Sequence, residues 1–392
     1  MDKALGELGS DQSRFHKEPV ELSATFDAVS RPDLTRCNVI CSCLAYLCMQ
    51  IVGRVMFFGT MAAAALTPGV VIAQSSKPTM KAIVVHEYGG PEVLKYEEVP
   101  RPEPKEDQIL VRVIAAGVNP VDAMIRSGMF AKYEKEVFPI IPGADIAGVV
   151  EKVGSKITKF KAGDPVFAYV SLKGGGGYAE YALATEHDTA AKPKSLTYLE
   201  AAAVPIVALT AWQALIDSGK LSAGQTVLIH GGSGGVGSFA IQLAKARGAK
   251  VIATASAANQ DLLKQLGADV AIDYTQQKFE DVAKDVDVVL DSVGKDTLAR
   301  SYGLVKKGGV IVSIVARPDK TELDKRGIRG AVLSVEPNAD ELAEIGKLID
   351  EKKIKVIVSQ TFPLSDAAKA QEQVATGHTR GKVVLKVADK QK

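Results

Sequence analysis

Between residues 206 and 336, short and mostly apolar runs alternate with segments whose apolar positions recur every three or four residues. Such short apolar runs are typical of strands that are buried on both faces of a parallel sheet. Strands are predicted at 226–229, 251–253, 270–272, 286–290 and 310–314, and helices around 239–244 and at 260–266 and 298–305. Strands that alternate with helices at this spacing predict an α/β fold with a doubly wound parallel sheet.

The residues from Met80 to about 205 follow a different pattern. Turn-rich segments with Gly and Pro, such as 88–91 and 100–104, separate stretches that are typical of β-strands. These stretches lie at 82–85, 109–113, 146–150 and 166–168. The pattern predicts a mixed, strongly curved β domain that precedes the parallel-sheet domain.

The N-terminal extension, residues 1–79, differs from both regions. Residues 1–33 are polar, mixed in charge and without clear periodicity, which is typical of a disordered segment. An apolar region follows at 37–73, and Arg54 is the only charged residue within it.

The second half of this apolar region allows three interpretations. Residues 55–66 resemble the apolar core of a signal peptide, Pro68 then breaks the helix, and small residues at 71–73 suit a signal peptidase. Residues 55–73 also approach the ~20 residues that a membrane-spanning helix requires. A cleaved signal, a membrane anchor and an extension of the reading frame without a role all remain open.

Composition mainly excludes classes of protein. The 392 residues, enough for two or three domains, are 46% hydrophobic and 24% charged, as in soluble globular proteins. A formal net charge of +2 gives no reason to expect a nucleic-acid partner. All four cysteines lie in the N-terminal apolar region, where they are more typical of small hydrophobic side chains than of metal ligands. They are Cys37, Cys41, Cys43 and Cys48, so the chain after them has no disulfide and no thiolate metal site.

The strongest functional signal is the glycine-rich segment after the first predicted strand of the parallel sheet. Gly232, Gly234 and Gly237 form a G-x-G-x-x-G motif between that strand and a helix. Glycines permit a tight turn and let backbone N–H groups approach a pyrophosphate at the positive end of the helix. Strand, motif and helix in this order predict a dinucleotide site made by Gly232, Ser233, Gly234, Gly235, Val236 and Gly237.

The end of the second predicted strand indicates which dinucleotide binds. An acidic residue there would bind the ribose 2′-hydroxyl of NADH, but residues 254–258 contain no carboxylate. Ser256 can donate to a 2′-phosphate, although no Arg or Lys follows it at once. The segment therefore favours NADPH, and Ser256 as a loop hydroxyl bound only to water remains the alternative.

Seven further motifs follow one another in a fixed order. They lie at 80–83, 89–94, 117–122, 125–128, 142–148, 208–212 and 377–383. With the glycine-rich loop, this order resembles the medium-chain dehydrogenase/reductases, and specifically their zinc-free quinone oxidoreductase branch, the zeta-crystallin-like enzymes. The resemblance extends from Met80 onward and leaves out the N-terminal extension.

The resemblance implies a GroES-like catalytic domain at 80–205 and 337–392 and a Rossmann NADP-binding domain at 206–336. The return to the first domain predicts helices at 339–350 and 365–375 and strands at 354–358 and 383–387. Enzymes of this branch usually dimerise through the edge of the Rossmann sheet, so the resemblance also implies a homodimer.

The same resemblance implies that no metal takes part. Zinc-dependent relatives carry a thiolate at the position of Asn119 and a His–Glu pair at the positions of Ala144 and Asp145. A catalytic zinc needs about three protein ligands, and these positions do not supply them. The histidines of the body are scattered, and each is interpreted as a surface or strand-end residue: His86, His187, His230 and His378.

Chemistry without a metal narrows the substrates. Quinones and enones need less polarisation than simple aldehydes, because the charge that arrives with a hydride is delocalised onto a distant oxygen. The predicted reaction is NADPH-dependent hydride transfer to a quinone or an α,β-unsaturated carbonyl compound. The alternatives are an enoyl-thioester reductase and a non-catalytic NADPH-binding protein. The reductase would require a basic pocket for coenzyme A phosphates, and the sequence contains no compact Lys/Arg cluster for one. NADPH chemistry points to the cytoplasm, whereas the N-terminal extension points to export or a membrane, so the location stays open.

Three residues of the catalytic domain are implied to take part in catalysis. Asn119 would lie beside the nicotinamide and donate its amide to the substrate or to the nicotinamide ribose; otherwise it only forms the turn before Pro120. Asp122 and Arg126 complete the set, although their i, i+4 spacing also allows a helix-surface ion pair. Met124 replaces a tyrosine that the family often has, which removes a possible hydroxyl donor.

Further cofactor contacts are implied in the Rossmann domain and at the C-terminus. Thr210 would contact the nicotinamide end, and Tyr274 would border the adenosine phosphate unless it is an ordinary strand-end aromatic. Ile314, after the fifth strand, and Lys382, in the last motif, are the remaining implied contacts.

Overall fold

The computed structural model of the chain describes residues 78–133, 135–172 and 175–389. The chain divides into two units, Met1–Ala73 and Gln74–Lys392, and the described residues all belong to the second. The signal, anchor and extension hypotheses and the cysteine cluster therefore concern positions outside the described residues. Within the described part, no helix is both long and apolar enough to cross a membrane.

One sheet has six parallel strands in the order β10-β9-β8-β11-β12-β13. From β8 the chain moves outward to β10 and then returns to β11, on the other side of β8. Its strands are β8 (Thr226–Ile229), β9 (Lys250–Ala255), β10 (Val270–Asp273), β11 (Val286–Asp291), β12 (Val305–Ser313) and β13 (Arg329–Val332). This reversal between β8 and β11 creates a crevice at the carboxyl ends of the strands. The predicted doubly wound α/β fold is confirmed.

The connections of this sheet are mostly helical. They are α4 (Gly235–Ala246), α5 (Gln260–Gln265), α6 (Lys295–Ser301) and α7 (Lys320–Arg326), with 3₁₀ turns η3 (Ala257–Asn259), η4 (Phe279–Asp281) and η5 (Tyr302–Leu304). The helix predicted at 298–305 begins earlier, at Lys295, and Val305 already belongs to β12. The sequence did not predict α7 or β13, because three of the four β13 residues are exposed and form no apolar run.

The other large sheet has seven strands in the order β14-β15-β3-β4-β5-β7, with β6 paired to β3. They are β3 (Ile109–Val118), β4 (Asp145–Val153), β5 (Pro165–Tyr169), β6 (Tyr181–Ala184), β7 (Thr189–Ala191), β14 (Val358–Pro363) and β15 (Lys382–Lys386). A separate antiparallel pair is formed by β1 (Thr79–Val84) and β2 (Lys95–Pro100). The antiparallel pairing of β15 with β3 brings the end of the chain beside the residues that precede Asn119.

The helices near this sheet are α1 (Pro120–Arg126), α2 (Tyr198–Ala202), α3 (Pro205–Trp212), α8 (Ala339–Asp350) and α9 (Ala367–Ala375). Shorter turns are η1 (Pro91–Val93), the π-helical η2 (Gln213–Ser218) and η6 (Leu364–Asp366). In α8, Leu342, Ile345 and Ile349 are buried at helical spacing, and the Asn338 side chain caps the helix, so it lies where the sequence predicts it. The strand predicted at 354–358 is wrong in position, because Lys355 pairs with the side chain of Gln242 and β14 begins only at Val358.

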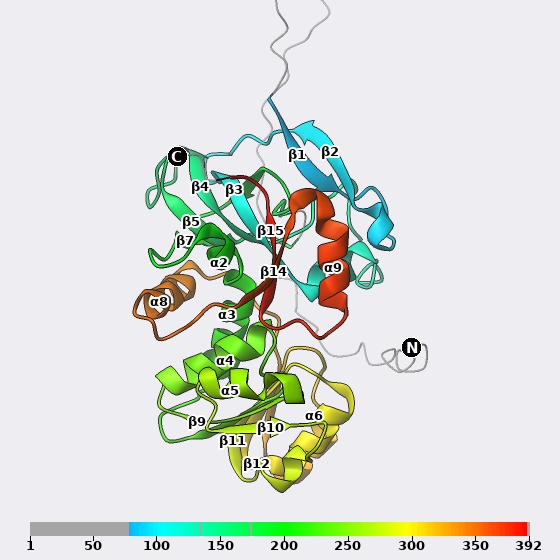
Figure 1. The fold of residues 1–392 in the computed structure, drawn as a ribbon, viewed down its shortest axis with the longest axis vertical. Helices are drawn as coiled ribbons and strands as arrows, with labels where there is room; N and C mark the ends of the chain where they lie inside the picture. The colour runs from blue at the N-terminus through cyan, green and yellow to red at the C-terminus, as the bar shows by residue number, and fades with distance from the viewer. Residues whose placement is uncertain (1–77, 134, 173–174, 390–392) are drawn as a thin grey trace, which may run out of the picture. The chain divides into compact units, whose positions relative to one another are not determined.

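Helix α3 lies between the two sheets (Figure 1). Pro205 to Ala211 are all buried, as expected for a helix that is apolar on every face. One continuous core joins Val111 of β3, Leu209 of α3 and Leu290 of β11. We propose residues 80–205 with 337–392 as the catalytic domain and 206–336 as the nucleotide-binding domain.

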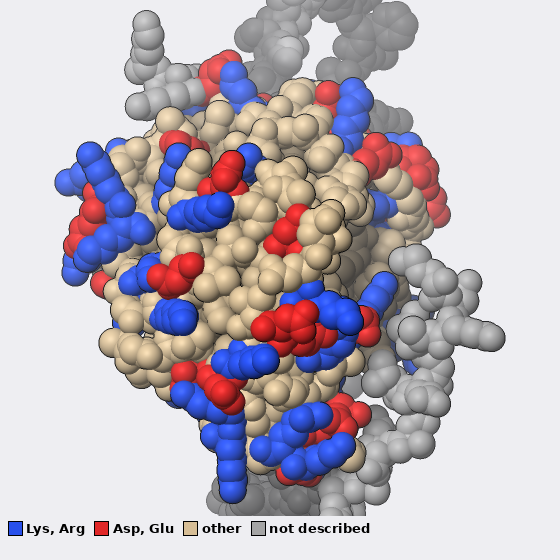
Figure 2. Space-filling model, turned by 60° about the horizontal axis from the view of Figure 1, so that its bottom comes forward, with Lys and Arg blue, Asp and Glu red and all other residues tan. Residues whose placement is uncertain are grey.

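Charged side chains on the surface are mixed in sign. On the face drawn in Figure 2, Lys and Arg lie interspersed with Asp and Glu. In the described part of the chain, opposite charges also form ion pairs such as Arg300 with Glu280 and Arg326 with Glu322. Over this face, therefore, the surface has no large area of a single charge.

Candidate functional site

A cleft of about 890 Å³ opens at the carboxyl ends of β8, β9, β11 and β12. The C-terminal segment closes one side, since the Gly381 N–H donates to the Ser233 carbonyl of the glycine-rich loop at 2.9 Å. The predicted site residues that line the cleft are Asn119, Ser233, Gly234, Gly235, Val236, Gly237, Ser256, Tyr274, Ile314 and Lys382. Asp122, Arg126, Thr210 and Gly232 are not among the residues that line it.

The glycines of the loop have different roles. A Cβ at Gly237 would lie 2.2 Å from the Gly231 carbonyl oxygen, and one at Gly232 would lie 2.8 Å from Leu263 Cδ2. Both glycines therefore permit close packing of the loop against α4 and α5. A Cβ at Gly234 would meet only the Gly231 oxygen, at 3.4 Å, so the fold itself has room for a side chain there.

The N-terminus of α4 fits a pyrophosphate. Gly234 is its N-cap, no side chain among the described residues caps it, and its first residues line the cleft. A twelve-residue helix presents free N–H groups and the positive end of its dipole at this point. The loop can therefore hold the pyrophosphate of a dinucleotide against the backbone.

The opposite end of the cleft is suited to an adenosine. Ser256 and Asn259 follow β9, and the Ser256 Oγ accepts a hydrogen bond from Asn259 Nδ2 at 3.2 Å. The hydroxyl proton of Ser256 is then available to a ligand. Tyr274 lines the same cleft and is 55% exposed.

The sequence did not predict that Arg300 and His230 line the cleft. Arg300 lies over the Phe279 ring at 4.5 Å and pairs with Glu280, so its position depends on contacts far apart in the sequence. His230, at the end of β8, is buried, and burial lowers its pKa to about 4, so the ring is neutral. Its nitrogens contact the hydroxyls of Thr254 and Ser301, which makes it a strand-end residue as predicted.

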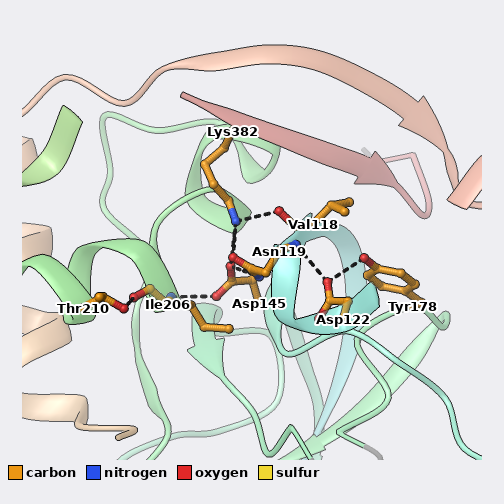
Figure 3. Close-up of polar contacts among 8 residues, drawn as sticks. All are labelled: Val118, Asn119, Asp122, Asp145, Tyr178, Ile206, Thr210 and Lys382. Atoms are coloured by element: carbon orange, nitrogen blue, oxygen red, sulfur yellow. Dashed lines mark hydrogen bonds and ion pairs between the residues drawn. The ribbon is translucent and has the colours of Figure 1, made fainter. Parts of the chain in front are cut away.

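Asn119 is the centre of a buried polar network (Figure 3). It follows β3 and is the N-cap of α1, and its Nδ2 donates to Asp145 Oδ2 at 2.8 Å. Lys382 Nζ lies 2.5 Å from Asn119 Oδ1, 2.9 Å from the Val118 carbonyl oxygen and 3.3 Å from Asp145 Oδ2. Asp145 Oδ1 accepts from the Ile206 N–H at 2.7 Å and so connects the network to α3.

Asp122 supports Asn119 from below the cleft. Its Oδ2 accepts the Asn119 backbone N–H at 2.9 Å and the Tyr178 hydroxyl at 2.8 Å. Burial raises the pKa of Asp122 to about 6. Burial and the neighbouring Asp122 carboxylate hold the pKa of Tyr178 well above its usual range. The tyrosine therefore stays protonated and donates to the carboxylate.

The remaining implied residues lie behind the cleft wall. Arg126 is buried and donates to Gln371 Oε1 at 2.8 Å and to the Gly89 carbonyl at 2.6 Å, so it forms no surface ion pair with Asp122. Thr210 Oγ1 donates to the Ile206 carbonyl at 2.6 Å, within α3. The Arg126 side chain thus holds α1 against Gly89 and Gln371, and the Thr210 hydroxyl bonds to the backbone of its own helix, α3.

The positions where relatives bind zinc do not offer a ligand set here. Asn119 and Asp145 are bonded to each other, Asp145 is fully buried, and Ala144 has no donor atom. Nowhere in the described part of the chain do three His, Cys, Asp or Glu side chains come together as a metal site. Both carboxylate oxygens of Asp145 are already engaged, by Asn119 and Lys382 and by the Ile206 amide.

A parallel sheet with a glycine-rich loop, and a β domain that contributes polar side chains to the same cleft, define a dinucleotide-dependent dehydrogenase or reductase.

Comparison with known proteins identifies the family. One family profile, described as "Alcohol dehydrogenase GroES-like domain", matches residues 105–194, and another, described as "Zinc-binding dehydrogenase", matches 266–385. An NADPH-dependent alkenal/one oxidoreductase of Arabidopsis thaliana is 41% identical over 327 residues, which are 80% of this chain and 82% of the relative.

Solved structures agree with this relationship. The quinone oxidoreductase of Coxiella burnetii matches with a TM-score of 0.74 and 39% identity, over 79% of this chain and all of that one (100%). The Escherichia coli quinone oxidoreductase complexed with NADPH matches with a TM-score of 0.71 and 32% identity, again over 79% and 100%. The chain belongs to the zinc-free quinone oxidoreductase branch of the medium-chain dehydrogenase/reductases, which confirms the predicted family.

Proposed function

We propose that the protein transfers a hydride from NADPH to a quinone or to an α,β-unsaturated carbonyl compound. The observation that carries this proposal is that Asn119 of the catalytic domain and the glycine-rich loop of the other sheet line the same cleft. The relatives named above act on alkenals, alkenones and quinones, which are acceptors of this chemical class.

NADPH is the proposed cofactor and supplies the hydride. The glycine-rich loop would hold its pyrophosphate, and Ser256 with Tyr274 would face its 2′-phosphate, where no carboxylate opposes the negative charge. Ile314 would border the cofactor from the end of β12. Two relatives support this choice, since the Arabidopsis enzyme is named as NADPH-dependent and the E. coli structure contains NADPH.

The chain's own residues would act by position and by hydrogen bonding. Asn119 is the proposed catalytic residue, because its amide lines the cleft and can donate to an oxygen. Asp122 would hold the Asn119 backbone, and Arg126 would anchor α1 against Gly89 and Gln371. No step requires a metal.

The experiment is an NADPH oxidation assay with a panel of quinones, enones and one enoyl thioester, each with and without a strong chelator. We expect turnover of quinones or enones, a much lower rate with the thioester, and no effect of the chelator. Turnover of the thioester alone would indicate the enoyl-thioester reductase instead. Activity that is lost with the chelator and restored by zinc would contradict the metal-free reaction.

We propose a homodimer that forms through β13. This strand is one of the two edges of the six-stranded sheet, and Arg329, Gly330 and Val332 are exposed, so its outer backbone groups can pair with a second copy. Sedimentation of the protein should give the mass of two chains. Because the Leu333 N–H donates to Ser313 of β12, the Val332 N–H points to the open edge. Val332→Pro, which removes this outward donor, should weaken the dimer.

For the N-terminal extension we propose a targeting role with cleavage before the body of the enzyme. The support is its composition, together with the chloroplast location in the name of the Arabidopsis relative. N-terminal sequencing of native protein should then begin near Gln74. A start at Met1 in a membrane fraction would favour the anchor.

A further inference from the structure

We propose that Lys382 and Asp145 are positioning residues that fix the direction of the Asn119 side-chain amide. The cleft then receives a hydrogen-bond donor from Asn119, and no acceptor. This inference rests on the proposed function, because it assigns the donor to the carbonyl oxygen of the quinone or enone.

The direction of the amide follows from the chemistry of its two neighbours. The two ends of an asparagine amide are nearly equal in size, so only hydrogen bonding distinguishes them. An ammonium can only donate and a carboxylate can only accept. Lys382 Nζ lies 2.5 Å from Asn119 Oδ1, and Asp145 Oδ2 lies 2.8 Å from Asn119 Nδ2 (Figure 3). A flipped amide would set a donor against the ammonium and an acceptor against the carboxylate, so this direction is excluded.

Burial makes this restriction strong. Asp145 is fully buried and Lys382 is 4% exposed, so water does not replace the lost bonds if the amide turns. The pair is also attached to the surrounding structure, since Lys382 binds the Val118 carbonyl and Asp145 binds the Ile206 amide. Asn119 is thus held from β3, β4, α3 and β15 at once.

Lys382 has no proton left for a direct contact with the cofactor. Its three N–H groups match three acceptors: the Val118 carbonyl, Asn119 Oδ1 and Asp145 Oδ2. Its contribution to the cleft is the aliphatic stem, whose Cδ would lie 3.2 Å from a Cβ at Gly235. Lys382 therefore acts on a ligand through Asn119.

The second Nδ2 proton of Asn119 is the donor that remains. One proton is given to Asp145, and among the described residues the other has no acceptor, while Asn119 itself lines the cleft. When a hydride adds to the β carbon of an enone, the C=C electron pair forms a new bond to the carbonyl carbon and the C=O π pair moves to the oxygen. A proton from water then adds at the α carbon as the C=O bond re-forms. A donor that is already aimed at this oxygen stabilises the developing charge without reorganisation.

The test is the double variant Lys382→Met with Asp145→Asn. It removes both buried charges together, because the single variant Lys382→Met would leave Asp145 as an unpaired buried charge and impair folding. In the double variant the new amide at position 145 keeps its oxygen on the Ile206 N–H and turns its NH2 group toward Asn119, which favours the flipped amide. The methionine at position 382 no longer opposes that direction. The control is Lys386→Met, a lysine of the same strand that is half exposed and pairs with Asp389 at the surface.

We expect kcat of the double variant to fall by about ten- to a hundredfold, with KM and the NADPH dissociation constant within about threefold of the wild type. The dissociation constant is measured from the fluorescence of bound NADPH. The loss should be larger for enones than for quinones, because an enolate concentrates its charge on fewer atoms than a hydroquinone anion. Lys386→Met should behave as the wild type.

Three results would overturn the inference: an unchanged kcat, equal losses for enones and quinones, or a loss that appears only in NADPH binding. The last would assign Asn119 to the nicotinamide ribose. A wild type that reduces neither acceptor class would instead overturn the proposed function, so the two failures are distinguishable.

Discussion

At the scale of single residues, Asp122 is a buried carboxyl group with an unsatisfied oxygen. Its Oδ1 has no hydrogen-bond partner in the described part of the chain, while its Oδ2 accepts two bonds. Burial raises its pKa from 3.8 to about 6, so the folded protein holds this proton more tightly than the unfolded chain does. The carboxyl group therefore favours folding at low pH, and this contribution is lost as the pH rises through about 6.

We predict that Asp122→Asn, which stays neutral, gains stability relative to the wild type as the pH rises. Between pH 4 and pH 7 the difference in the free energy of unfolding should move by about 2 kcal/mol in favour of the variant. Urea titrations at several pH values measure this difference. The exposed Asp107→Asn is the control, and a pH-independent difference for Asp122→Asn would contradict the prediction.

A second residue-scale prediction concerns the choice of cofactor. Ser256→Asp places a negative charge where the 2′-phosphate is proposed to bind, so kcat/KM for NADPH should fall by about a hundredfold relative to that for NADH. The exposed Ser222→Asp, outside the cleft, should leave the ratio unchanged. A wild type that uses NADH as efficiently as NADPH would show that the assignment of this loop is wrong.

At the scale of elements, the glycine-rich loop and α4 separate folding from binding. Gly234 has room for a side chain in the fold but faces the cleft, whereas Gly237 touches the loop backbone. Gly234→Val should therefore keep the melting temperature and lose NADPH binding by at least about a hundredfold, while Gly237→Val should lower the melting temperature. Gly303→Val is the control, since a Cβ there would meet only Arg326, at 3.7 Å. Retained NADPH binding in a folded Gly234→Val protein would remove the loop from the cofactor site.

At the scale of the whole described unit, two buried glutamines hold the segments that cross between the sheets. Gln242 of α4 exchanges two hydrogen bonds with the backbone of Lys355, at 3.0 and 2.7 Å. Gln213 of η2 does the same with Glu336, at 2.9 and 3.1 Å. Each side chain satisfies both the N–H and the carbonyl of a residue that lies outside any strand. These bonds hold the crossing segments in place.

We predict that Gln242→Leu destabilises the protein by about 1–3 kcal/mol, because the N–H and carbonyl of Lys355 lose their partners. Thermal or denaturant unfolding measures the change, and the exposed Gln265→Leu is the control. If both variants lose the same free energy of unfolding, the bonds between Gln242 and Lys355 do not stabilise the segment that crosses between the sheets.

The sequence alone could predict the parts that depend on neighbours in the chain. The spacing of apolar residues and the short apolar runs predicted the positions of β8 to β12 and of α8. A strand buried on both faces and an amphipathic helix each show their pattern within a few residues of sequence. The glycine-rich loop and the absence of an acidic residue after β9 were visible for the same reason. The edge strand β13 left no such pattern, since it is mostly exposed.

What only the tertiary structure decided is how distant polar residues share one site. Asn119, Asp145, Ile206 and Lys382 come from four segments, and no local pattern reveals that an ammonium and a carboxylate hold the two ends of one amide. The family motifs implied that Lys382 contacts the cofactor. In the structure its buried ammonium group instead donates to Asn119, Asp145 and the Val118 carbonyl. Local spacing determines secondary structure and loop chemistry, and the pairing of β15 with β3 determines which side chains become neighbours.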